Sequence, residues 1–168
     1  MPIALPTAAP KRPFGSRLRT ARARLSEPVG GPEPIAAAVC FRRRDRRLQF
    51  RLVRTSDGER WTFPKGRQKP EETLAQTAAR EAAEKAGVTG VIGDKRLTEY
   101  RYARRADDLA AAFLLAVQSI GPSSDRERDP TWFDLATTGE KLAEGRDAVH
   151  ARVLQEVLRL AEHELQDR

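Results

Sequence analysis

The segment from Gly66 to Val88, GRQKPEETLAQTAAREAAEKAGV, constrains this chain more than any other part of it. Residues three or four apart share one face of a helix, so Glu81, Glu84 and Lys85 would project from the same side. The opposite side suits close packing on a sheet because its side chains are small and apolar. It consists of Ala75, Ala78, Ala79, Ala82 and Ala86. The segment therefore predicts a helix that packs its alanine face on a sheet and carries charge on the other.

The residues around this helix predict its ends and a ligand. Pro70 suits the first turn of a helix, and Gly87 suits the left-handed residue that stops one. Two carboxylates in register, Glu81 and Glu84, repel each other unless a cation lies between them. A hard divalent ion such as Mg²⁺ takes oxygen ligands and shares itself with phosphates. The alternative is an ordinary solvated face, since this composition also suits a surface helix.

The same segment resembles the Nudix box, whose pattern is G-x5-E-x7-R-E-U-x-E-E-x-G-U, where U is a bulky aliphatic residue. Two positions depart from it: Lys85 replaces the second glutamate of the E-E pair, and Ala82 is small where U is usually larger. The positions that agree are Gly66, Glu72, Arg80, Glu81, Glu84, Gly87 and Val88. The chain is identified on this ground as a Nudix family member.

The resemblance implies a hydrolase that cleaves a P–O–P bond by water attack, with Mg²⁺ or Mn²⁺ bound. Carried over by position, Arg80, Glu81 and Glu84 are the expected catalytic residues. The expected metal ligands are Glu84, the carbonyl of Gly66, and Glu81, which could instead be the base that activates water.

Two further positions of the box are expected to be structural. Glu72 would pair with Arg80 and hold the preceding loop against the helix, and Gly87 would end the helix. Outside the box, families of this type often recruit one more acid, and the sequence does not choose among the candidates. These are Glu99, Asp107, Asp108 and Glu127.

Lys85 changes the expected chemistry, because an ammonium in place of a carboxylate shifts the local charge by two units. A unit charge at about 5 Å contributes roughly 3 kcal/mol at an effective dielectric near 20. The lysine could point outward on its long stem, or it could replace one metal ion and touch a phosphate. Either arrangement predicts weaker metal binding and slower turnover. A nucleotide-binding or regulatory domain with impaired catalysis is therefore the alternative function.

Basic residues near the glycine predict an anionic small-molecule substrate, a nucleotide or a polyphosphate. The expected substrate-binding residues are Lys65, Arg67, Arg54, Arg60 and Lys85. The alternative is an exposed basic surface on a basic protein. Trp61 could stack on a base or be structural.

The rest of the sequence predicts an α/β fold with a mixed sheet, and the resemblance implies the α/β/α sandwich of the Nudix fold. Strands are expected at 35–41, 48–55, 88–92, 97–102 and 109–120, and helices at 136–144 and 147–164. The last helix is expected to pack on the sheet through an apolar stripe. Its members are Val149, Val153, Leu154, Val157, Leu160 and Leu165.

The flanks of the box favour one subgroup of the family. They are similar to the diphosphoinositol polyphosphate and dinucleoside polyphosphate phosphohydrolases. The similar positions are Ala38-Val39-Cys40-Phe41-Arg42, Arg60-Trp61, Pro64, Trp132-Phe133 and Val149-His150-Ala151.

Length and charge divide the chain into a tail, residues 1–34, and one domain, residues 35–168. The net charge is +7, and the tail combines seven prolines with six basic and two acidic residues. It is predicted to be disordered, with weak nucleic-acid contact as the alternative function. The longest apolar run is too short to cross a bilayer, so we expect a cytoplasmic protein. Oligomeric state stays open, and Cys40 is expected to be buried.

Overall fold

The computed structural model describes residues 33–168, so the predicted disordered tail lies almost entirely outside the described residues. The centre of the fold is a mixed sheet of eight strands. Its two central strands, β1 (Ile35–Arg44) and β7 (Leu109–Ile120), run parallel to each other, and every other pairing is antiparallel. The mixed sheet predicted from the sequence is therefore confirmed.

The remaining strands extend this centre in both directions. The main order is β3-β2-β1-β7-β5, while β4 pairs with β1, β6 with β7 and β8 with β2. Their bounds are β2 (Arg47–Arg54), β3 (Trp61–Thr62), β4 (Lys65–Arg67), β5 (Val88–Ile92), β6 (Thr98–Arg101) and β8 (Thr131–Asp134). A short 3₁₀ helix, η1 (Arg126–Arg128), precedes β8.

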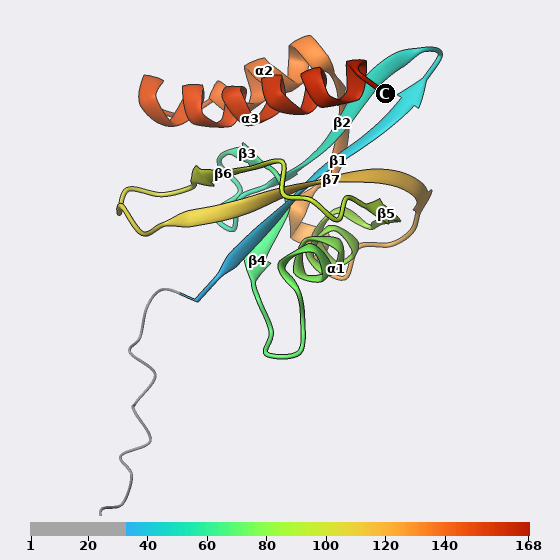
Figure 1. The fold of residues 1–168 in the computed structure, drawn as a ribbon. Coiled ribbons are helices and arrows are strands. Elements are labelled where there is room, and N and C mark those ends of the chain that lie inside the picture. The colour runs from blue at the N-terminus through green and yellow to red at the C-terminus, as the bar shows by residue number, and fades with distance from the viewer. Residues whose placement is uncertain (1–32) are drawn as a thin grey trace, which may run out of the picture. The chain divides into compact units, whose positions relative to one another are not determined.

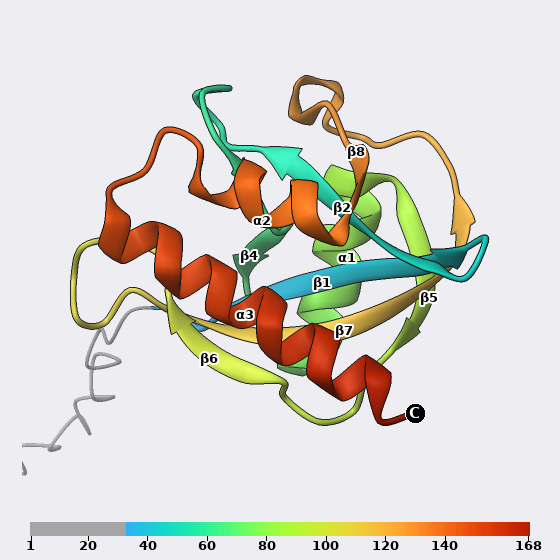
Figure 2. The same ribbon diagram turned by 90° about the horizontal axis from the view of Figure 1, so that it is seen from above.

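Helices cover both faces of the sheet, which gives the expected α/β/α sandwich. In Figure 1, α2 (Leu135–Ala143) and α3 (Ala148–Gln166) lie above the sheet and α1 (Leu74–Ala86) lies below it. Seen from above, α3 crosses over β1 and β7 (Figure 2). Each central strand sends alternate residues to opposite faces, so the sheet separates two apolar cores.

In the core between α1 and the sheet, the contact of α1 with β1 is built from small side chains. Ala36, Ala38 and Cys40 of β1 meet Ala78 and Ala82 of α1, and all of them are fully buried. Because these side chains are small, the helix approaches the sheet closely, as the alanine face predicted. Burial also raises the pKa of the Cys40 thiol to about 12, which keeps it protonated at neutral pH.

The helix α1 begins at Leu74, and the prediction that Pro70 lies in its first turn is wrong. Thr73 caps the helix instead: its hydroxyl accepts from the Gln76 backbone, and the Gln76 side chain accepts from the Thr73 backbone. The helix ends as predicted, because Gly87 adopts the left-handed conformation at φ 63°.

The core under α2 and α3 contains the larger side chains, including Phe50 and Phe63, each of which contributes about 1.5–3 kcal/mol by burial. The predicted stripe on α3 is partly wrong, because Val149 is 68% exposed. The buried stripe consists of Ala151, Leu154, Val157, Leu158, Ala161 and Leu165. Within residues 33–168, no helix is both long and apolar enough to cross a membrane.

Candidate active site

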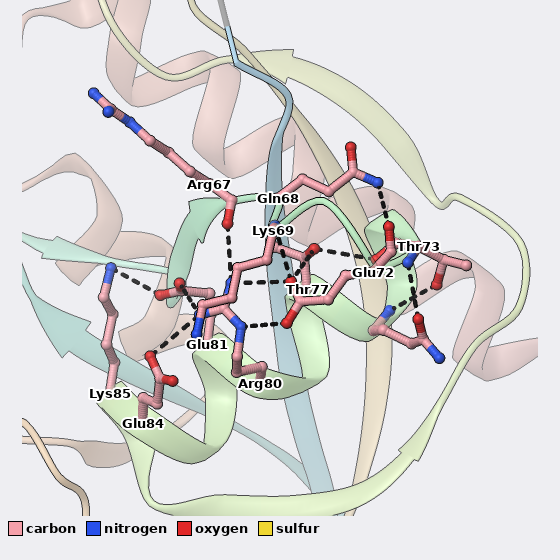
Figure 3. A network of polar contacts seen from close by, with 11 residues as sticks. Arg67, Gln68, Lys69, Glu72, Thr73, Thr77, Arg80, Glu81, Glu84 and Lys85 are labelled. Carbon is pink, nitrogen blue, oxygen red and sulfur yellow. Dashed lines mark hydrogen bonds and ion pairs between the residues drawn. The ribbon is translucent and has the colours of Figure 1, made fainter.

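Arg80 organises the corner where the loop before α1 meets the helix (Figure 3). Its Nε lies 2.6 Å from Glu72 Oε1, and its Nη2 donates to Glu72 Oε2 at 3.1 Å and to the Arg67 carbonyl at 2.9 Å. The structure thus forms the Glu72–Arg80 pair that the family resemblance implied. This guanidinium lowers the pKa of Glu72 to about 2 and has its own pKa raised in return.

The carboxylates of Glu81 and Glu84 converge on the same atom of Arg80. Nη1 lies 2.8 Å from Glu81 Oε1 and 3.2 Å from Glu84 Oε2. Their environments differ, since the side chain of Glu81 is 8% exposed and that of Glu84 is 44% exposed. Glu81 is therefore fixed at the base of the site, while Glu84 stands at its edge.

Gly66 lets the buried carboxylate approach the backbone of β4. A Cβ at this position would lie 2.1 Å from Glu81 Oε1 and 2.2 Å from Cδ. Any side chain there would displace Glu81, so glycine is required by space and not by its backbone dihedrals. β4 pairs with the start of β1, where Gly66 is opposite Ala36, and this pairing fixes the glycine beside the helix.

Lys85 points into the site and not toward solvent. Its Nζ lies 3.0 Å from Glu81 Oε2 and donates to the Lys65 carbonyl oxygen. Glu81 Oε2 is buried and has no hydrogen-bond partner, so the ammonium faces it as a neighbouring charge without good donor geometry. The sequence left two orientations open for this lysine, and the structure has the inward one.

The donor set fits one hard divalent cation. Glu81 and Glu84 supply carboxylate oxygens, one of them buried and without a hydrogen bond, and the backbone of Gly66 lies against the Glu81 carboxylate. Among residues 33–168, no three His, Cys, Asp or Glu side chains gather as a possible metal site. Where a complete box has a further carboxylate beside Glu81 and Glu84, this chain has Lys85, whose ammonium lies 3.0 Å from Glu81 Oε2.

A cavity of about 1100 Å³ opens beside this corner. Of the predicted substrate-binding residues, Lys65, Arg67, Arg60 and Lys85 line it, and Arg54 does not. The Arg54 guanidinium instead stacks on the Trp61 ring at 4.0 Å. Trp61 is only 4% exposed and packs edge-on against Phe133, so it is a core residue and not a platform for a base.

The cavity is strongly basic. Eight lysine and arginine side chains line it against four carboxylates. Sequence reasoning missed half of the cations, because they come from the end of β6, the β6–β7 loop, η1 and the α2–α3 loop, which only the fold brings together. They are Arg101, Arg104, Arg128 and Arg146.

The predicted extra acids do not line this cavity. Glu99 pairs with Arg96 on the surface, and Asp108 accepts from the Arg105 backbone, while Asp107 and Glu127 also lie elsewhere. The acids that do line it outside the box are Asp57 and Asp147. Hydrogen bonds lower the pKa of both, mainly from Thr55 to Asp57 and from the His150 backbone to Asp147.

Lys65 is a half-buried cation among other positive groups. Its pKa falls from 10.5 to about 8, first because of burial and then because of Lys85, Arg146 and Arg128. Its Nζ also lies 5.5 Å from the centre of the Tyr102 ring. A multiply charged anion would offset the repulsion among these neighbouring cations.

Comparison with known proteins agrees with this geometry. The family model of the NUDIX domain matches residues 32–157. The chain resembles a C. elegans Ap4A hydrolase in a binary complex, with 19% identity and a TM-score of 0.62, covering 81% of this chain and 99% of that one. It also resembles the NUDIX domain of Shewanella oneidensis NrtR complexed with ADP ribose, with 22% identity and a TM-score of 0.64, covering 85% and 95%.

A NUDIX hydrolase from Nitrosomonas europaea is similar as well, with 18% identity and a TM-score of 0.58, covering 79% of this chain and 90% of that one. No curated protein sequence matches the chain significantly. The likeness to these structures shows the fold, and the family match covers most of the chain. The chain therefore belongs to the NUDIX domain family.

Proposed function

We propose that this protein is a Mg²⁺-dependent pyrophosphohydrolase that cleaves a P–O–P bond in a nucleoside diphosphate derivative, a dinucleoside polyphosphate or a diphosphoinositol polyphosphate. The observation that carries the proposal is the convergence of Glu81 and Glu84 on Arg80, beside Gly66 and at the wall of a basic cavity. Membership of the NUDIX domain family supports a pyrophosphohydrolase activity. It also supports metal dependence, since NUDIX hydrolases generally use divalent metals.

In this proposal Glu84 and the Gly66 carbonyl would hold the metal, which would polarise the phosphate and acidify a water. Glu81 would be either a further metal ligand or the base that accepts the proton of the attacking water, and the Lys85 ammonium lies 3.0 Å from its Oε2. The water oxygen forms a bond to phosphorus, and the bond from phosphorus to the bridging oxygen breaks, so the leaving phosphate keeps the electron pair. Arg80 holds both carboxylates in place through one guanidinium nitrogen.

The lining of the cavity favours the most highly phosphorylated of these substrates. Eight cationic side chains far exceed what a single diphosphate needs, and Trp61 is buried away from the cavity. Bidentate guanidinium contacts recognise phosphate groups directly. We therefore rank diphosphoinositol polyphosphates and dinucleoside polyphosphates above ADP-sugars, in keeping with the flanking sequence similarity.

The Lys85–Glu81 ion pair supports a second candidate, a domain that binds nucleotides with impaired catalysis. The Lys85 ammonium partly neutralises the carboxylate that would act as metal ligand or base. A fixed positive charge beside Glu81 weakens the attraction of this carboxylate for a divalent ion. The two candidates differ only in turnover, because both use the same basic cavity.

A substrate panel separates the two candidates. Wild-type protein is incubated with diphosphoinositol phosphates, dinucleoside polyphosphates and ADP-sugars, with Mg²⁺, Mn²⁺ or no metal, and products are resolved by chromatography. Metal-dependent cleavage that is lost in Glu84→Gln supports the hydrolase. Ligand-induced thermal stabilisation without product, in both wild type and Lys85→Glu, supports the binding domain. If no panel member is cleaved and none stabilises the protein, both candidate functions are contradicted.

A further inference from the structure

The hairpin between β1 and β2 carries a dense group of arginines that the proposed active site does not use. We name the segment Arg42–Arg47, with sequence RRRDRR, the arginine hairpin. It extends past the neighbouring strands, away from α1 (Figure 1). Arg44 lies eight residues beyond Ala36, which pairs with Gly66, and this corresponds to about 27 Å along a strand. The arginine hairpin is therefore separate from the catalytic corner.

The pairing of the two strands collects four guanidiniums on one face. Arg44 lies directly opposite Arg47, and Cys40 lies opposite Arg51, so side-chain alternation places Arg42, Arg44, Arg47 and Arg51 on the same side. Arg42 is held there by the Trp132 ring, 4.0 Å from its guanidinium, and by the Gln49 side chain, which accepts from Nε at 2.8 Å. The result is a ribbon face with arginines at positions 42 and 44 of β1 and at positions 47 and 51 of β2, where Arg51 also donates to the Ala86 carbonyl at 2.7 Å.

Within residues 33–168, no arginine of the hairpin forms an ion pair with a carboxylate. Arg43 donates to the Leu165 carbonyl at the end of α3, and Asp45 is the one acid in the segment. Arg47 contributes to the lowered pKa of Asp134, whose main cause is the Thr137 backbone. Burial lowers the pKa of Arg42, and the positive charge of Arg44 lowers it further.

Two features of the hairpin oppose folding. Like charges directly opposite each other, as Arg44 and Arg47 are, destabilise a strand pair. The two turn residues, Asp45 and Arg46, have φ of 49° and 65°, and such a turn favours glycine at the second position. An arginine there is strained and solvent-exposed. The repulsion between Arg44 and Arg47 would be offset by an anionic polymer that binds the ribbon.

We propose that the arginine hairpin binds double-stranded nucleic acid through its phosphates. A two-stranded ribbon has the width that enters a major groove, and repeated guanidiniums match a repeating phosphate backbone better than a single phosphate. A membrane surface fits less well, since none of the exposed large apolar residues of the described chain lies in the hairpin. The proposal is independent of the proposed hydrolase function.

The test measures binding of the full chain to a fluorescent 20-base-pair DNA duplex over a salt series. The variant is Arg44→Gln/Arg46→Gly/Arg47→Gln, and the matched control is Arg96→Gln/Arg152→Gln/Arg159→Gln, which removes the same charge from exposed positions elsewhere. The hairpin variant is expected to bind at least about 10-fold more weakly, and its salt slope to fall by about 2 to 3. The control variant is expected to keep nearly the wild-type duplex affinity and salt slope.

Arg46→Gly alone separates recognition from folding. Glycine relieves the strained turn, so the melting temperature is expected to rise by a few degrees while duplex affinity falls. Equal losses in the hairpin and control triples would overturn the proposal, because net charge alone would then explain binding. Unchanged duplex binding in the hairpin triple, or hairpin-dependent binding to vesicles with anionic lipid but none to the duplex, would also overturn it.

Discussion

The catalytic corner and the arginine hairpin are both rich in charge, and they use it in opposite ways. At the corner, Arg80 contacts three carboxylates and Lys85 contacts one, so each charge fixes the position of another. At the hairpin, the like charges of Arg44 and Arg47 face each other, and the strained residue Arg46 carries a further positive charge. Ion pairs fix the positions of side chains in a site before a ligand binds, whereas cations without an ion pair can bind an anionic ligand.

The largest expected effect is the loss of activity when the catalytic corner loses the carboxylate of Glu84. Glu84→Gln is expected to lower kcat at least about 100-fold, because the side chain loses its charge toward a metal ion and toward the phosphates. Stability is expected to change little, since Glu84 is 44% exposed. Steady-state hydrolysis and thermal melting are measured together, with Glu127→Gln as control outside the cavity. Wild-type turnover in Glu84→Gln would remove the proposed role.

Arg80→Lys sharpens the claim that this guanidinium organises the corner. A lysine cannot reach Glu72, the Arg67 carbonyl and both carboxylates at once, so unfolding free energy is expected to fall by about 1–3 kcal/mol. Activity is expected to fall as well, through misplaced carboxylates. Denaturant unfolding gives the stability, and Arg159→Lys on the surface of α3 is the control. Equal stabilities of wild type and Arg80→Lys would contradict the organising role.

Lys85→Glu tests whether the inward ammonium limits metal binding. The change removes the positive neighbour of Glu81 and supplies another carboxylate, so Mn²⁺ affinity is expected to rise about 10-fold or more. Lys85→Gln is the intermediate case, because it removes the charge without adding an oxygen anion. Titration followed by electron paramagnetic resonance measures free Mn²⁺. Identical affinities in all three proteins would show that Lys85 does not act on the metal.

Glu72 gives the smallest predicted effect, a pH dependence of stability. Its pKa is lowered from 4.5 to about 2 by Arg80, so its stabilising contribution is full above pH 4.5 and is lost as pH falls toward 2. The difference in urea midpoint between wild type and Glu72→Gln should therefore shrink between pH 6 and pH 3. Glu156→Gln provides a control with an exposed partner. A difference that grows on acidification would contradict this sign.

Sequence patterns predicted the long elements well, for a physical reason. β5 and β7 have the predicted bounds, and in β7 the continuous apolar run at 109–117 includes the buried part of the strand. The strands β3, β4 and β8 were missed, since two to four residues carry no periodicity and are fixed by their partners. The start of α1 has a sequence signature, the capping box formed by Thr73 and Gln76. The prediction relied on Pro70 instead and was wrong.

The candidate site likewise contains residues that local sequence patterns predict and residues that only the fold brings together. Arg80, Glu81 and Glu84 lie on one helix, so local spacing sufficed to bring them together. Arg128 and Arg146 reach the cavity from distant segments, and no local pattern could place them there. Arg54 was assigned to the substrate by proximity in sequence, but its guanidinium is engaged by Trp61.

The most direct test of the central claim is anomalous diffraction from crystals soaked with Mn²⁺ and a non-hydrolysable polyphosphate. We predict one manganese peak bound by Glu84 and Glu81 next to Gly66, with the phosphates in the basic cavity and the Lys85 ammonium beside them. Carboxylates of Glu81 and Glu84 turned apart, or manganese and phosphate bound only at other places, would contradict the account.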